Sequence, residues 1–368
     1  MHHPSHARLL GIERPTLVEQ IVGMFHLPYF LGCVVLASVM GPAGILLADY
    51  MDTGDMSVAL SDILSPYSGH PSWTGLLDLS LVAFIIFWLL YMIRFMRLRL
   101  ARAGPQLLSL SPETETTRKI FGRVSEALPQ LLVAAILFAV TQTFLILVTG
   151  FSSSNITSGY FGLGSPLSYL IELLFYLTIG TFVWVYASSL WGIHRFGKEP
   201  LRLKPFYQDP LLGLGEMGTL SLYLAFAYFT VFGPVMLESL FLSPDPVGYA
   251  TLFPFIILGG IMFFLPLNSI HQKMVKVKKR EREDIEQRLA DILTLLHNPS
   301  HNPDGAAATS SQIENLLKVE MLQVTQRSLD LVPSWPYDKA TLERFTALFL
   351  SVASLLISQL AQKYIRGS

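Results

Sequence analysis

The clearest candidate for a functional polar residue in this sequence is Glu172, which lies within the apolar stretch "LSYLIELLFY". A carboxylate inside a membrane-spanning segment is costly, and it commonly marks an ion pathway, a proton pathway or a polar contact between helices. Gln142 lies at a similar depth in the preceding apolar segment, between Thr141 and Thr143. Two uses of this intramembrane polar site stay open: a Glu172–Gln142 hydrogen bond that joins two helices, or an ion or ligand site that opens outward.

Small and polar residues recur three or four positions apart in the last apolar segment, so they share one face of a helix. They are Ala347, Ser351, Ser354, Ser358 and then Ala361 or Gln362. Such a face allows helices to pack closely. It can also line a pore in a symmetric oligomer, where hydroxyl and amide groups contact water or ions. The pore-lining candidates are Ser351, Ser354, Ser358 and Gln362.

Two more carboxylates, Asp78 and Glu238, lie near the predicted outer ends of the second and fifth apolar segments. Together with Glu172 they could form an outer acidic vestibule that favours cations. The simpler interpretation is that they are solvated at the membrane surface.

The sequence contains no motif of a common enzyme class. It has no HExxH zinc site, no glycine-rich phosphate loop and no GxSxG nucleophile turn. The two histidines of "HNPSHNP" lie in a polar connector without a third ligand, and the single cysteine, Cys33, excludes a disulfide within the chain. We therefore predict a protein that is not an enzyme and has no metal or cofactor.

The composition indicates what must position these residues. The chain has 368 residues, of which 51% are hydrophobic and 14% charged, whereas soluble proteins carry roughly 25% charged residues. Six apolar runs, at about 28–48, 76–96, 128–150, 167–192, 216–240 and 249–270, approach the length of ~20 residues that crosses a bilayer. Backbone polar groups in lipid need internal partners, so these runs should be helices. We predict an all-α membrane bundle that contacts lipid and binds no nucleic acid.

The distribution of lysine and arginine predicts the orientation of the bundle. The connections after the second, fourth and sixth runs are rich in lysine and arginine, whereas the other three connections contain neither. Because basic loops stay on the cytoplasmic side, the N-terminus should be cytoplasmic.

The segment after the sixth run predicts helices outside the membrane. The sixth helix is expected to continue into the basic stretch, followed by an apolar stripe at Ile285, Leu289, Ile292 and Leu296. A flexible linker is expected at 298–311, before a second stripe formed by Ile313, Leu317, Met321 and Val324. These helices could form a hairpin within the chain or pair with copies of it. We expect three regions: 1–270 with six spans, 271–333 in the cytoplasm, and 334–368.

The stretch "SWPYDKATLERF" predicts the start of a seventh helix. Trp335 and Tyr337 are suited to the membrane interface, Pro336 ends the preceding element, and Asp338 can cap the new helix. Residues 342–362 would then cross the bilayer to an outer C-terminus. A re-entrant or surface-lying helix is the alternative.

Three stretches, "WPYDKATL", "LPLNSIHQKMVKVKKRE" and "YQDPLLGLGEMG", resemble a group of uncharacterised prokaryotic polytopic membrane proteins. That group has a Trp-Pro-Phe-Asp-like step and a loop beginning with His-Pro-Asp, where this chain has Tyr207-Gln208-Asp209. The resemblance covers about 200–365 and implies no known activity. In layout alone, the chain also resembles seven-helix channels of the insect chemoreceptor type, which form tetramers; their Thr-Tyr…Gln-Phe signature is absent.

Three functions are consistent with these features. The first is a homo-oligomeric ion channel, with a tetramer implied by the second resemblance, whose seventh helix lines the pore. The second is a non-catalytic scaffold or accessory subunit of a membrane complex. The third is a secondary transporter that uses Glu172 as its coupling carboxylate.

Overall fold

The computed structural model describes residues 14–64, 73–149, 166–241, 246–297 and 305–367, and in these ranges it contains helices and no strand. The prediction of an all-α fold is therefore confirmed for the described residues. The α-helices are α2 (Leu17–Gly23), α3 (Tyr29–Ser38), α4 (Gly44–Thr53), α5 (Met56–Leu64), α6 (Trp73–Leu110), α7 (Thr114–Gly122), α8 (Ala127–Thr149), α10 (Pro166–Lys198), α11 (Gly215–Phe241), α12 (Pro246–Phe264), α13 (Asn268–His297), α14 (Gly305–Asp330) and α15 (Lys339–Gly367).

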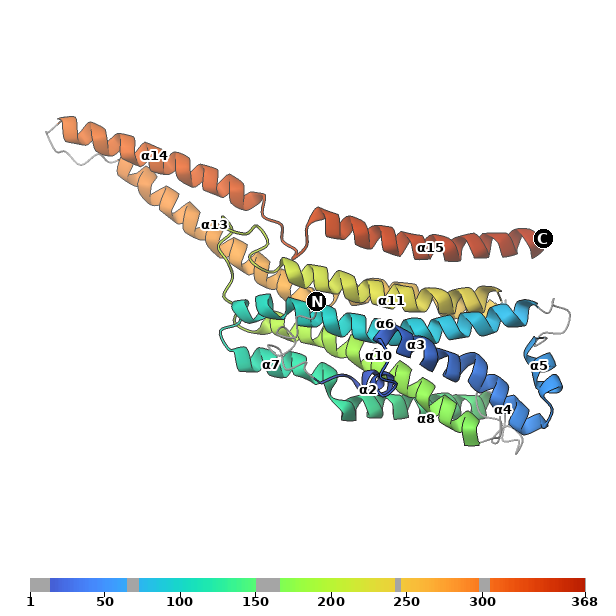
Figure 1. The fold of residues 1–368 in the computed structure, drawn as a ribbon. Helices are drawn as coiled ribbons and strands as arrows, with labels where there is room; N and C mark the ends of the chain where they lie inside the picture. The colour runs from blue at the N-terminus through green and yellow to red at the C-terminus, as the bar shows by residue number, and fades with distance from the viewer. Residues whose placement is uncertain (1–13, 65–72, 150–165, 242–245, 298–304, 368) are drawn as a thin grey trace.

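Five helical stretches in the described ranges are long and apolar enough to cross a membrane. They are Tyr29–Leu47, Gly75–Leu110, Ala127–Phe144, Tyr169–Lys198 and Gly215–Val235. The helices that contain them lie side by side and form the bundle seen in Figure 1. The chain is thus a helical bundle whose apolar helices are suited to a multi-pass membrane protein.

Helix α6 lies at the centre of this bundle, where it packs against α3, α10 and α11. Its residues Leu90, Ile93, Met96 and Leu100 have no exposed surface. Their spacing of three or four residues places them on one stripe of the helix, which is the side that faces its neighbours. Helices α3 and α4, which share the first apolar stretch, are joined by a π-helical segment (Val39–Ala43) that contains Pro42.

Helices α8 and α10 make a very close backbone contact. A β-carbon on Gly180 of α10 would lie 2.6 Å from the Cα atom of Ala134 in α8. Van der Waals packing of this kind is a principal source of stability between helices in a membrane, where the hydrophobic effect no longer drives association. Gly180 is therefore required for the approach of these two helices.

The sixth apolar helix ends earlier than the sequence predicts. Helix α12 stops at Phe264 and α13 starts anew at Asn268, so the predicted continuous helix is wrong. Pro266 lies between them, and its ring and missing N–H group interrupt a helix. The first turn of α13 is held on α10, because the Ser269 hydroxyl donates to the carbonyl of His194 at 2.9 Å. The boundary predicted at residue 270 therefore falls inside α13.

Two other predicted boundaries also change. Helix α6 continues to Leu110, so the arginines expected in the connection after residue 96 are helical. Helix α14 begins at Gly305, so residues 305–311 of the predicted flexible linker belong to a helix.

Helices α13 and α14 run alongside each other and extend beyond one end of the bundle (Figure 1). Ile285 of α13 and Leu329 of α14 are buried in one cluster with Val332, which follows α14. The predicted stripe of α14 does not take part in this packing. Its members are mostly exposed: Ile313 by 55%, Leu317 by 57%, Met321 by 71% and Val324 by 56%.

Candidate functional site

The start of α15 is fixed by several contacts. The Asp338 carboxylate accepts a hydrogen bond from the Thr341 backbone N–H at 2.8 Å, which is the geometry of an N-cap. Pro336 is buried, and its carbonyl oxygen occupies the space where Gly218 of α11 would otherwise carry a β-carbon. The half-buried Trp335 indole stacks on the His271 imidazole, with ring centroids 4.1 Å apart. Trp335 thus fastens the start of α15 to the first turn of α13, and its anchoring at a membrane interface stays a prediction.

One side of α15 packs against its own chain. The ring of Phe345 is buried and stacks on Phe263 of α12 at a centroid distance of 3.9 Å. Phe349, one turn later, contacts Phe229 of α11 edge to face at 6.1 Å. These aromatic contacts determine which side of α15 turns toward the bundle, because they hold the helix against both α11 and α12.

The pore-lining candidates lie on the other side of α15. Ser351, Ser354 and Ser358 are exposed. The hydroxyl groups of Ser351 and Ser354 donate to backbone carbonyls of their own helix, at Leu348 and Ser351, over 2.7 and 3.0 Å. The side chain of Gln362 lies outside the described residues. The chain thus leaves this polar face uncovered, so the face is available to lipid, water or another copy.

The intramembrane polar site brings its two main residues together. The amide of Gln142 on α8 donates a short hydrogen bond to the Glu172 carboxylate on α10, so the predicted contact between these residues is present. Glu172 is only 2% exposed. Thr143 is exposed, and its hydroxyl donates to the carbonyl of Ala139 in its own helix at 2.7 Å. Thr141 is partly buried beside Gln142. The geometry is that of a polar contact joining two helices.

The outer acidic vestibule stays a prediction. Asp78 is partly buried near the start of α6, whereas the side chain of Glu238 lies outside the described residues.

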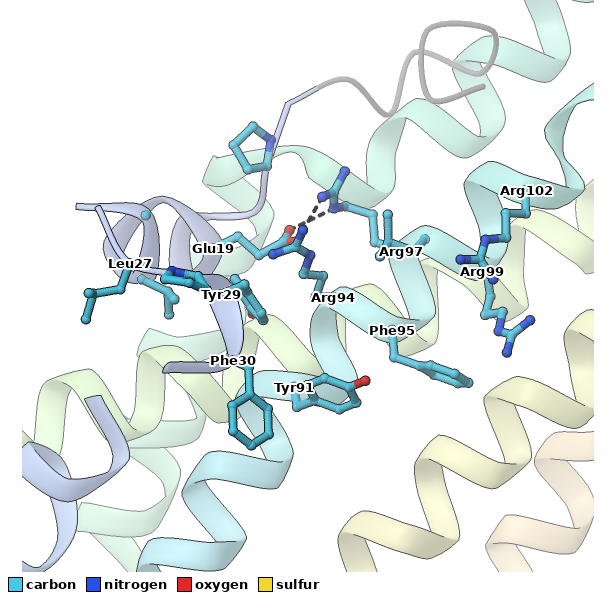
Figure 2. Close-up of a pocket in the computed structure, with 15 residues that line it drawn as sticks. Glu19, Leu27, Tyr29, Phe30, Tyr91, Arg94, Phe95, Arg97, Arg99 and Arg102 are labelled. Carbon is cyan, nitrogen blue, oxygen red and sulfur yellow. Dashed lines mark hydrogen bonds and ion pairs between the residues drawn. The ribbon is translucent and has the colours of Figure 1, made fainter. Parts of the chain in front are cut away.

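A basic groove that the sequence did not reveal lies where α2 and α3 meet α6. Its volume is about 930 Å³, and α6 contributes four arginines to it: Arg94, Arg97, Arg99 and Arg102. Figure 2 shows Arg94 and Arg97 beside Glu19 of α2, near the rings of Tyr29, Phe30 and Tyr91, whereas Arg99 and Arg102 lie farther along α6, past Phe95. We name this feature the arginine groove.

One of the four arginines has a structural role. The Arg97 guanidinium makes two hydrogen bonds of 2.8 Å with the carboxylate of Glu19, and the two side chains are only 12% and 4% exposed. Glu19 also completes the N-cap of α2, because its carboxylate accepts from the backbone N–H of Thr16 while the Thr16 hydroxyl accepts from the N–H of Glu19. This pair fastens α2 to α6 and forms one wall of the groove.

Aromatic rings hold two other arginines. The Arg94 guanidinium carbon lies 4.3 Å from the ring centre of Tyr29, and that of Arg99 lies 3.9 Å from Tyr223 on α11. The Tyr29 ring is itself fixed, because its hydroxyl donates to the carbonyl of Leu90 at 2.8 Å. Rings stabilise a guanidinium through its face and leave its N–H edges able to donate. Within the described residues, no carboxylate forms an ion pair with Arg94, Arg99 or Arg102.

The loop quoted for its resemblance is organised by Asp209. Its carboxylate accepts from the backbone N–H groups of Leu211 and Gly213, at 2.9 and 3.0 Å. Gly213 has a φ of +87°, a backbone conformation that favours glycine. The carbonyl of Gly213 accepts from the Gln106 amide of α6 at 3.0 Å. Asp209 and Gly213 therefore fold the connection between α10 and α11 onto the end of α6.

No protein-family model, curated protein or solved structure matches this chain. Within the described ranges, no group of three or more His, Cys, Asp or Glu side chains is placed to hold a metal ion. Function is therefore inferred from the contacts, burial and charges of the chain's own residues.

Proposed function

We propose that this chain is the subunit of a homo-oligomeric ion channel in a membrane, with α15 lining the pore. The observation that carries the proposal is the division of α15 into two faces. Its aromatic face packs on α11 and α12, and its serine face is left uncovered by the chain.

We also propose that the chain crosses the membrane seven times. Helices α12 and α15 would add two spans to the five apolar stretches, because both pack against α11. Figure 1 shows α15 running along α11. The lysines and arginines of the connections gather at the end from which α13 and α14 extend, so this end would be cytoplasmic. Helices α13 and α14 would then form a cytoplasmic hairpin, and the C-terminus would lie outside.

Assembly is supported by the exposed stripe of α14. In a cytoplasmic helix, Ile313, Leu317, Met321 and Val324 would face water on an isolated chain. Burying apolar surface of this kind contributes roughly 25 cal/mol per Å², which favours association. Contact between copies through this stripe would bring subunits together around a common axis.

The pore is supported by the chemistry of α15. Ser351, Ser354 and Ser358 present small hydroxyl-bearing side chains, which permit close helix packing and offer oxygen atoms to water or ions. In the same helix, Leu350 and Ile357 are exposed by 57% and 64%, and they project to a neighbouring sector suited to lipid.

Cysteine accessibility tests this assignment. The only cysteine, Cys33, is buried and can be replaced by alanine to give a silent background. Ser351→Cys and Ser354→Cys would then be treated with a membrane-impermeant cationic thiol reagent during conductance recordings in planar bilayers. We expect rapid modification that lowers the cation current.

Leu350→Cys and Ile357→Cys are matched controls, because they lie on the same helix and are similarly exposed on the single chain. If all four cysteines react at the same rate, or if the pure protein conducts no current, the pore is disproved. An oligomer without conductance would instead support the scaffold. Proton- or sodium-driven uptake that Glu172→Gln abolishes would support a transporter.

Oligomer formation is tested separately. Leu317→Lys and Met321→Lys place charges in the exposed α14 stripe and should convert oligomers into smaller species in lipid nanodiscs, as measured by particle imaging. Gln323→Lys, an exposed position of α14 that lies outside the stripe, is the control. Unchanged oligomers in all three variants would exclude the α14 stripe as the contact.

A further inference from the structure

If the apolar stretch of α6 crosses a bilayer, its length places the arginine groove where lipid headgroups begin. Arg94 follows Gly75, the start of the apolar stretch of α6, by about 19 residues. That length corresponds to about 28 Å of helix, close to the ~30 Å thickness of the hydrocarbon core. A molecule in the groove can therefore contact the arginines with a polar group while an apolar part remains in the bilayer.

The groove has two chemically different parts. Near Arg94 it is lined by two exposed rings that belong to apolar stretches, Phe30 (56% exposed) and Tyr91 (37%). Leu27, which is 44% exposed, lines the groove just before α3 begins. Farther along α6 it is lined by Arg99 and Arg102. An apolar part followed by a basic part matches an amphiphile that has acyl chains at one end and an anionic group at the other.

The charge of the groove favours an anion. Glu19 neutralises Arg97, so the other three arginines keep their positive charge. Guanidinium groups bind phosphate oxygens through paired N–H donors, and the ring of Tyr29, which lines the groove, already orients that of Arg94. Arg99 is held over Tyr223 of α11, at the far end of the groove. The groove is thus partly preorganised for a phosphate group.

We propose that the arginine groove binds the phosphate group of an anionic phospholipid from the leaflet at the basic end of the bundle, with its acyl chains along Phe30 and Tyr91. This site is independent of the proposed pore. It would tie α2 and α3 to α6 through a bound lipid.

Lipid retention tests the proposal. The purified full-length chain would be incorporated in nanodiscs of phosphatidylcholine that contain a small fraction of phosphatidylglycerol, and its bound lipids counted by native mass spectrometry. We expect the unmodified chain to retain phosphatidylglycerol selectively. The triple variant Arg94→Gln, Arg99→Gln, Arg102→Gln should lose roughly 100-fold in affinity, from about 1 kcal/mol for each basic residue near an anionic surface.

The control is a second triple variant that also removes three positive charges at this end of the bundle, but outside the groove. Arg118→Gln, Lys119→Gln and Lys198→Gln change three exposed residues outside the groove. This variant should retain the lipid as the unmodified chain does. Equal retention by both triple variants would overturn the proposal.

Thermal unfolding of each variant in phosphatidylcholine alone distinguishes a lost lipid site from a lost fold. Arg97 is left unchanged because it stabilises that fold. If the groove triple variant unfolds, Phe30→Ala alone should still weaken phosphatidylglycerol retention, and unchanged retention would overturn the proposal.

Millimolar inorganic phosphate distinguishes a phospholipid from a free phosphate as the ligand of the groove. We expect phosphatidylglycerol to stay bound in its presence, because the acyl chains add contacts that inorganic phosphate lacks. Displacement of the lipid by phosphate alone would assign the groove to a free phosphate and overturn the lipid assignment.

Discussion

The imidazole of His271 and the indole of Trp335 lie almost parallel, with their ring centroids 4.1 Å apart and their planes inclined by 15°. A nitrogen of the same imidazole is 2.8 Å from the carbonyl oxygen of Ser334. Through these contacts, the segment before α15 and the first turn of α13 hold each other in place.

Trp335→Ala should loosen the start of α15. Loss of a large aromatic side chain costs roughly 3–5 kcal/mol when the site is fully buried, so we expect about half of this at the half-buried Trp335. Hydrogen exchange should rise in the first turns of α15. Tyr207→Ala is the control, because that ring is 75% exposed in the same half of the protein. Equal exchange in both variants would contradict the role of Trp335.

Gly218→Ala should destabilise the bundle, because the new methyl group would clash with the carbonyl of Pro336. Overpacking of this kind costs about 1–3 kcal/mol. Gly23→Ala in α2 is the control, because its methyl group would meet no atom of another part of the chain within 4 Å. That variant should be neutral or stabilised by up to about 1 kcal/mol, since alanine favours helix. Thermal unfolding in one detergent compares the two, and an equal fall in the midpoint for Gly23→Ala would contradict this account.

The cap of α15 should weaken in acid. Hydrogen bonds from the Thr341 side chain and backbone hold the pKa of Asp338 below its ordinary value of 3.8. The ionised carboxylate therefore stabilises the helix above that pH, and the contribution is lost as the pH falls through the lowered pKa. Exchange of the Thr341 amide should increase below about pH 3.8 in the unmodified chain.

Asp338→Asn keeps a side-chain acceptor without a titrating group, so its Thr341 exchange should lack this acid-dependent increase. Asp338→Ala should lose about 1 kcal/mol at every pH. An identical pH profile in the unmodified chain and Asp338→Asn would show that another group is responsible.

The Gln142–Glu172 contact should contribute measurable coupling. Glu172→Leu and Gln142→Leu, alone and together, form a double-mutant cycle read by unfolding in detergent. Side-chain hydrogen bonds in membrane proteins average about 0.6 kcal/mol and reach about 1.7. We expect the upper part of this range, because Glu172 is buried and accepts a short hydrogen bond. Additive effects of the two substitutions would mean that the contact does not stabilise the bundle.

The sequence predicts features that depend on local pattern. Apolar runs predict helices because the bilayer admits few alternatives. The Gln142–Glu172 contact follows from two polar residues at the same depth in consecutive antiparallel helices. The capping role of Asp338 can be predicted because an N-cap depends only on residues within one turn.

Features that depend on contacts between segments far apart in the sequence cannot be predicted from local pattern. In the sequence, the arginines of α6 serve only to predict the orientation of the bundle. Their helical spacing also places them near Tyr91 and Phe95, which is a partial signal for the groove. The rest of the groove comes from α2 and α3, and no local pattern shows that Glu19 reaches Arg97. The stripe of α14 is visible in the sequence, but its outward direction depends on how α14 packs against α13.

The close contact of Gly180 with Ala134 also constrains how this protein can change shape. Neither backbone can slide past the other there, and about two turns away the same two helices are joined by Gln142 and Glu172. Helices α8 and α10 should therefore move as one rigid body. Any rearrangement of the bundle must then be accommodated at the boundaries between this pair and its neighbours.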